Sequence, residues 1–177
     1  EPVADALGLH AIRLIFKYLP IAVKNPEDIT ARGHMLLASS IAGMCFVNTM
    51  TGGVHATAHA LGALYGIPHG LANAIMLPVV MAFNASEVPE RYMMIADAMG
   101  LDVKDKKPVE AAKMAVKAVV SLKKKIGLTD TLKDFKVPND PAKLKPLVEL
   151  AAADGQVSYN PHYLEEEDIL KIYMKAI

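Results

Sequence analysis

Three of the six histidines in this 177-residue chain, His55, His59 and His69, fall within fifteen consecutive positions. Their neighbours are mostly small or apolar, and a buried imidazole without a partner costs about 1 to 3 kcal/mol. Each ring therefore needs a hydrogen bond or a metal ion. One histidine in such surroundings is usually an ordinary core residue, but three at this spacing favour a cluster of metal ligands.

The segment that carries the histidines predicts two helices joined by a break. His55 and His59 are four residues apart, so on a helix they lie on one face. Gly66-Ile67-Pro68 ends this helix and places His69 at or near the first turn of the next one. All three imidazoles could then meet at one point. A catalytic zinc or ferrous site usually has at least three protein ligands, so if His59 has another role, only two remain.

The composition predicts one all-α domain over residues 1–177, a multi-helix bundle. Hydrophobic residues make up 53% of the chain and aromatic residues 6%, with ten Met and no Trp. No stretch alternates apolar and polar residues convincingly, as a strand would. A chain of this length can bury about 70% of its unfolded surface, which is enough for one core.

Capping and breaking residues predict where the helices begin and end. The first helix covers residues 3–18 and ends at Pro20, and the Asn25–Asp28 turn caps a long central helix that runs to about Asn48. Pro78 is expected to kink the helix that follows His69. Later helices are expected from Pro89 to Gly100, from Pro108 to Gly127, from Pro141 to about Asp154, and from Glu165 through Lys175.

Charge and cysteine content exclude several classes of function. The formal net charge is zero, so nucleic acid is not an expected partner. Cys45 is the only cysteine, which excludes an internal disulfide and predicts a buried thiol in a reducing cytoplasm. The apolar runs 35–50 and 71–83 are too short to span a bilayer, so no membrane partner is expected. The chain begins with Glu1-Pro2 and lacks an intact signal peptide, which hints at a longer or processed protein.

The histidine segment resembles the histidine signature of the iron-dependent alcohol dehydrogenases. The resemblance lies in Gly53-Val54-His55-Ala56-Thr57-Ala58-His59-Ala60-Leu61-Gly62-Ala63 and in Pro68-His69-Gly70-Leu71-Ala72-Asn73-Ala74, followed by Leu77-Pro78. Weaker similarities reach the end of the chain, at Asp154, Asn160-Pro161 and Asp168-Ile169. His162 departs from the family, which often has Arg there, and is expected to be peripheral. The resemblance covers nearly all 177 residues but only the second half of a family chain.

This resemblance implies the fold, the site and the partners. The fold would be the C-terminal helical domain of the dehydroquinate synthase-like and iron-dependent alcohol dehydrogenases. His55 and His69 would hold a divalent metal, Fe²⁺ or Zn²⁺, and His59 would face the substrate and the nicotinamide without binding the metal. The other two ligands, an Asp and a His, would lie upstream, since Asp5 and His10 lack their spacing.

The resemblance also implies that a Rossmann-like domain binding NAD or NADP is missing from this chain. No glycine-rich phosphate-binding motif occurs in it. The chain would be the metal-binding half of an enzyme that interconverts alcohols and aldehydes or ketones. The whole enzyme is expected to be a homodimer or a larger assembly.

 By itself, the 177-residue chain is expected to show no turnover.

Two other interpretations stay open at this point. In the first, the chain is a self-contained helical metal-binding module without catalysis, in which His55, His59 and His69 all coordinate the ion. In the second, it is a structural or assembly fragment, and its histidines are ordinary core residues that only form hydrogen bonds. Metal content and its dependence on each histidine distinguish these interpretations from the dehydrogenase.

Overall fold

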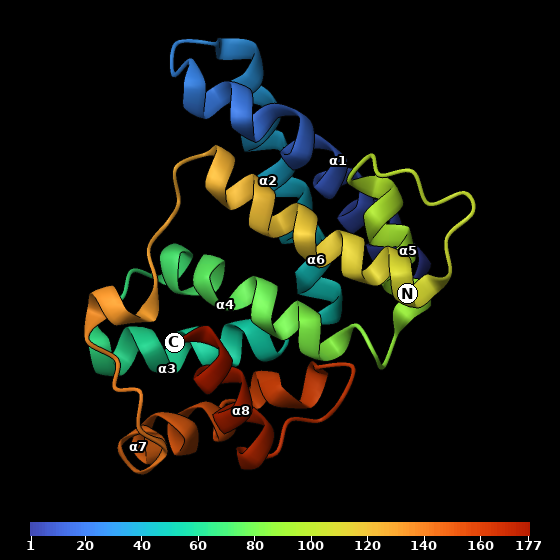
Figure 1. Ribbon diagram of the computed structural model, residues 1–177. Helices are drawn as coiled ribbons and strands as arrows, with labels where there is room; N and C mark the ends of the chain where they lie inside the picture. The colour runs from blue at the N-terminus through green and yellow to red at the C-terminus, as the bar shows by residue number, and fades with distance from the viewer. The chain divides into compact units, whose positions relative to one another are not determined.

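The computed structural model describes all residues from Glu1 to Ile177 and consists of helices without any strand (Figure 1). The α-helices are α1 (Pro2–Lys24), α2 (Ile29–Thr49), α3 (Gly53–Tyr65), α4 (His69–Asn84), α5 (Pro89–Ala98), α6 (Pro108–Lys125), α7 (Pro141–Ala152) and α8 (Glu166–Ala176). Two short 3-10 helices, η1 (Leu132–Phe135) and η2 (Gly155–Tyr159), lie before and after α7. The prediction of an all-α fold is confirmed.

Most helix boundaries follow from the capping residues in the sequence. The Asp28 carboxylate accepts a hydrogen bond from the Ala31 N–H at 2.8 Å and so caps α2. Asp140 caps α7 in the same way through the Ala142 N–H, at 3.0 Å. These side chains satisfy backbone donors that have no partner within the first helical turn.

Pro20 does not end α1, contrary to the prediction, because the helix continues to Lys24. A proline inside a helix removes one backbone hydrogen bond, but its fixed φ angle is compatible with helical geometry. The last turn of α1 is closed by the Asn25 N–H, which donates to the Ile21 carbonyl at 2.8 Å. Pro78 likewise lies inside α4, which is one continuous helix.

The chain forms two compact units, and each is assembled from two separate segments. Unit 1 comprises residues 1–50 and 88–128, and unit 2 comprises residues 51–87 and 129–177. Unit 1 therefore contains α1, α2, α5 and α6. Unit 2 contains α3, α4, α7, α8 and both 3-10 helices, and it carries all three clustered histidines.

Unit 1 is held together by helices that meet through alanine. Ala4 and Ala11 of α1 and Ala31 and Ala38 of α2 are all buried. Small side chains allow two helix backbones to approach closely, so α1 and α2 pack along each other. The Cys45 thiol takes part in this contact and donates to the Ala4 carbonyl at 3.2 Å, but it is only half-buried.

The prediction that α2 is a central helix is wrong. Only Ala31 and Ala38 of its residues are buried, whereas Ile29 and Leu36 keep 83% and 76% of their surface exposed. The small residues that suggested a buried helix form only one narrow stripe along α2, where it packs on α1. Most of the large apolar side chains of α2 are exposed, among them Met44 and Val47.

Helix α1 is long and apolar enough to cross a membrane, as judged by length and composition alone. Helices α2 and α3 meet the same test if they are counted as one span. Core helices of soluble proteins also pass this test, so it is weak evidence for a membrane protein.

Unit 2 is organised around α3, against which α4, α7 and η2 pack. Its core combines alanines with larger aliphatic side chains, one methionine and one aromatic residue, Tyr173 of α8, which is fully buried. The Tyr173 hydroxyl donates to the Thr57 carbonyl at 2.8 Å and so ties α8 to α3. Burial raises the pKa of Tyr173 above its ordinary value, which keeps the hydroxyl protonated as a donor.

Candidate metal centre and catalytic site

The histidine segment begins at a pair of glycines and breaks at a third. Gly52 is the extended cap residue of α3, and its carbonyl accepts from the His55 N–H at 2.9 Å. Gly66 ends α3 in the left-handed conformation, with φ of 64°, which favours glycine. Pro68 then caps α4, so that His69 is the first residue of that helix, as the sequence predicts.

This arrangement brings the three imidazole rings together. The ring centres of His55 and His59 are 5.7 Å apart, and the ring of His69 lies 5.4 Å from each of them. The first two rings lie one turn apart on α3, and the third approaches from the start of α4. The convergence that the spacing predicts is therefore present within unit 2.

The separation of His55 and His69 fits two ligands of one metal ion. Imidazole nitrogen binds zinc at about 2.0–2.1 Å, and two rings that share one ion then have centres about 5 Å apart. Their observed separation of 5.4 Å is close to this value. No group of three or more His, Cys, Asp and Glu side chains is arranged to hold an ion.

The two ring nitrogens of His69 have no protein partner in the plane of the ring. The Asn73 amide nitrogen lies 3.4 Å from Nδ1 and 3.3 Å from Nε2 of His69. A group nearly equidistant from both nitrogens at this range lies over the ring face, because an in-plane position would collide with the carbon between them. The same amide donates to the His69 backbone carbonyl at 2.9 Å, which fixes Asn73 there. The lone pair of a neutral His69 therefore stays available to a metal ion.

His59 differs from the other two histidines because an acidic side chain holds it. Its Nδ1 lies 2.7 Å from Oδ2 of Asp154, which precedes η2. The sequence marks Asp154 only as a weak similarity to the family and predicts no role for it. Nothing in the sequence pairs two residues that are 95 positions apart.

The surroundings of His55 and Asp154 lower the pKa of both side chains. Burial lowers the pKa of His55, and the nearby rings of His59 and His69 lower it further, so the neutral form is favoured. Burial acts to raise the pKa of Asp154. Hydrogen bonds from the Gln156 N–H and from His59 outweigh this effect, so the pKa of Asp154 lies below its ordinary value and the side chain is a carboxylate.

A buried pair of asparagines holds the start of α3. Asn84 and Asn160 exchange two amide hydrogen bonds, at 2.8 and 2.7 Å. Asn160 also accepts from the Gly53 N–H at 3.2 Å and donates to the His162 carbonyl at 2.7 Å. A side chain at Gly53 would lie 2.5 Å from Leu164, so the loop after η2 packs directly on the helix that carries His55.

The other three histidines are exposed or have contacts of their own. His34 stacks on Tyr18 within unit 1, with ring centres 3.9 Å apart, and His10 is exposed. His162 lies 3.7 Å from Glu87 and 3.8 Å from Asp168. None of these contacts involves one of the clustered rings.

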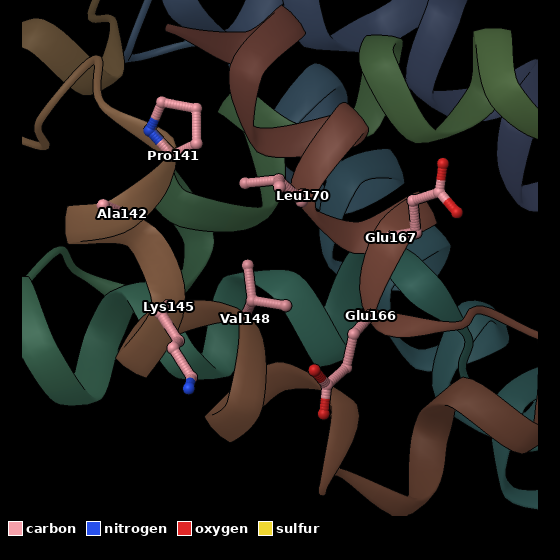
Figure 2. A pocket seen from close by; sticks show the side chains of 7 residues that line it. All are labelled: Pro141, Ala142, Lys145, Val148, Glu166, Glu167 and Leu170. Atoms are coloured by element: carbon pink, nitrogen blue, oxygen red, sulfur yellow. The ribbon is translucent and has the colours of Figure 1, made fainter.

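A cavity of about 460 Å³ opens between α7 and α8, but it is not the histidine site. Figure 2 shows Val148 and Leu170 pointing toward each other across it, with Lys145 and Glu166 along its edge. No histidine lines this cavity. Two of its charged residues already have partners, since Lys145 pairs with Glu149 and Glu167 pairs with Lys171.

Comparison with known proteins extends the likeness beyond the histidine segment. The model of a family described as "Fe-containing alcohol dehydrogenase family, C-terminal" matches residues 1–177. The chain is 39% identical to a 1,3-propanediol dehydrogenase of Citrobacter freundii over 176 residues, which are 99% of this chain and 45% of that protein. It is also 39% identical to the lactaldehyde reductase of Escherichia coli (strain K12), over 97% of this chain and 44% of the relative.

Two other relatives also match this chain over nearly its whole length. An NAD-dependent methanol dehydrogenase of Bacillus methanolicus is 35% identical over 99% of this chain and 46% of its own length. The crystal structure of a 1,3-propanediol oxidoreductase superimposes with a TM-score of 0.95 at 38% identity, covering 100% of this chain and 46% of that one. The chain thus spans less than half the length of each relative.

Proposed function

The chain belongs to the Fe-containing alcohol dehydrogenase family, and we propose on that basis that it is the metal-binding half of an NAD(P)-dependent alcohol dehydrogenase. The enzyme would interconvert small alcohols with aldehydes or ketones. The observation that carries this proposal is the convergence of the His55, His59 and His69 rings at the junction of α3 and α4.

His55 and His69 would hold the metal. Their separation suits two ligands of one ion, and the ring nitrogens of His69 are free of in-plane partners. When bound, the metal would supply Lewis acidity toward the substrate oxygen, and the dinucleotide would accept or donate the hydride. The family description favours iron over zinc, and the name of the Bacillus methanolicus relative favours NAD over NADP.

His59 would move the proton of the reaction. During oxidation, its Nε2 takes up the hydroxyl proton of the alcohol and passes it to solvent, and during reduction it returns a proton to the same oxygen. Its Nδ1 is hydrogen-bonded to Asp154, so only Nε2 can exchange a proton with the substrate. His59 is therefore the catalytic residue of this half.

The remaining parts of the enzyme would lie outside these 177 residues. No three potential ligand side chains of this chain are arranged to hold one ion, and the chain has no glycine-rich phosphate-binding motif. The other two metal ligands and the dinucleotide site are accordingly assigned to the part of the family chain that this sequence does not span. We place the complete enzyme in the cytoplasm as a homodimer or larger assembly, with neither nucleic acid nor membrane as a partner.

The test is to change each histidine in the complete protein and to measure metal content and alcohol-dependent NAD reduction. His55→Ala and His69→Ala should lose both metal and activity. His59→Ala should keep the metal and lose most of the activity, because general acid–base catalysis contributes about 10²–10⁴-fold. His162→Ala is the matched control and should change neither. Retention of the metal in the His55 and His69 variants would refute the proposal.

A second candidate rests on the near-equal spacing of the three rings. His59 lies 5.4 Å from His69, the same separation as that of His55 from His69. No three such side chains are placed to hold one ion as they stand, so a non-catalytic metal-binding module would require the His59 ring to leave Asp154 and turn toward the ion. In that case, His59→Ala would lose the metal as fully as the other two variants.

A further inference from the structure

The Asp154 carboxylate uses both of its oxygens. Oδ2 contacts Nδ1 of His59 at 2.7 Å, and Oδ1 accepts a hydrogen bond from the Gln156 N–H at 2.9 Å. The second bond is the N-terminal cap of η2. The orientation of the carboxylate is therefore set by the backbone and not by His59 alone.

A further pair of bonds braces this cap against the start of α3. The side-chain oxygen of Gln156 accepts from both the N–H and the hydroxyl of Thr51, at 3.1 and 2.7 Å. Thr51 lies two residues before α3, and η2 packs on α3. Asp154 and the helix that carries His59 are thus held in one arrangement.

This geometry determines which nitrogen of His59 carries a proton. An ionised carboxylate only accepts hydrogen bonds, so the His59 nitrogen that faces it must be the donor. In a neutral imidazole, the nitrogen opposite the donor is then the acceptor. The contact at Nδ1 leaves Nε2 unprotonated, which is the form needed to take a proton from an alcohol.

We propose that Asp154 is the positioning residue that fixes His59 in the tautomer protonated at Nδ1 and aims its Nε2 at the substrate. The proposal rests on the role given to His59 above. Asp154 acts through His59, and no contact of its own with substrate or metal is assigned to it. Removing an orienting carboxylate of this kind lowers the rate of other enzymes by presenting the wrong tautomer.

Asp154→Asn tests this role with little change in shape. Asparagine has one oxygen and one NH₂ group, and the Gln156 N–H requires the oxygen, so the NH₂ group must face His59. An NH₂ donor there requires Nδ1 to accept, which moves the ring proton to Nε2. The variant should therefore reverse the tautomer while keeping the cap of η2.

The tautomer is measured by ¹⁵N NMR of the histidine side chains in metal-free protein, at a pH where the ring is neutral. A His59→Gln spectrum identifies the His59 signals. We expect the proton on Nδ1 in the wild type and on Nε2 in Asp154→Asn, together with a fall in turnover on the order of 10²–10⁴-fold. Metal content should not change.

Asp140→Asn is the matched control, since Asp140 caps α7 in the same way and contacts no histidine. It should leave the His59 tautomer and the turnover unchanged. A wild-type His59 protonated at Nε2 would overturn the proposal without any variant, and so would an Asp154→Asn protein with a reversed tautomer and full turnover. If the wild type has the expected tautomer but no dehydrogenase activity, the proposed function fails, and with it the catalytic purpose of Asp154.

Discussion

Replacing Asn160 with alanine should weaken unit 2 more than any other single polar substitution around the histidines. The Asn160 side chain is buried and forms four hydrogen bonds. Two of them are with the Asn84 amide, one is with the Gly53 N–H, and one is with the His162 carbonyl. A buried donor or acceptor left without a partner costs about 1 to 3 kcal/mol, so the loss of this side chain should cost about 2 to 5 kcal/mol.

Asn84 offers a comparison because its amide bonds only to Asn160. After Asn84→Ala, the Asn160 amide keeps its bonds to Gly53 and His162, so we expect a cost of only about 1 to 2 kcal/mol. The double variant should be scarcely less stable than Asn160→Ala, because the first change already breaks the bonds that the second removes. The resulting coupling energy should be about 1 to 2 kcal/mol.

The measurement is urea unfolding followed by circular dichroism, with hydrogen exchange of the α3 amides as a local probe. Asn48→Ala on α2 is the control: Asn48 is exposed, bonds only within its own helix, and should change stability by about 0.5 kcal/mol or less. Equal costs for the two buried asparagines, or strictly additive costs in the double variant, would show that the pair does not hold α3 as described.

Two further predictions concern a glycine and an ion pair. Gly53→Ala should destabilise the protein by about 1 to 3 kcal/mol in urea because its side chain would meet Leu164, whereas Gly33→Ala, which has open space, should stabilise it by about 0.5 to 1 kcal/mol. The Arg91 guanidinium, bonded to Asp5, lowers the pKa of that carboxyl, so the pair stabilises the fold above the ordinary carboxyl pKa and the effect is lost as the pH falls through the lowered value. Arg91→Met should therefore move the acid-unfolding midpoint to higher pH, and an unchanged midpoint would contradict this assignment.

The sequence predicted the local features of the site well. The spacing of His55 and His59 and the break before His69 are encoded within a few residues, and helical periodicity converts such spacing directly into geometry. The same holds for the caps at Asp28 and Asp140. Each of these features depends on interactions between near neighbours along the chain.

The features that were missed or wrong depend on tertiary packing. Asp154 and Asn160 contact the α3 segment across 95 and 107 positions, and no local pattern indicates such pairs. The small residues of α2 indicated a buried helix, although they form only one contact stripe. Pro20 was expected to end α1, but the loss of one hydrogen bond did not outweigh the continuation of the helix.

The interleaving of the two units also constrains the order in which the protein can fold. The histidines come from the first segment of unit 2, whereas Asp154 and Asn160 come from the second, after the 41 residues numbered 88–128 that belong to unit 1. During synthesis, α3 and α4 leave the ribosome long before their partners exist, so the histidine site can take its final form only after the segment with Asp154 and Asn160 has been made. Joining the two segments closes a long loop, whose entropic cost grows only slowly with length, so the delay should appear in the folding rate more than in the final stability.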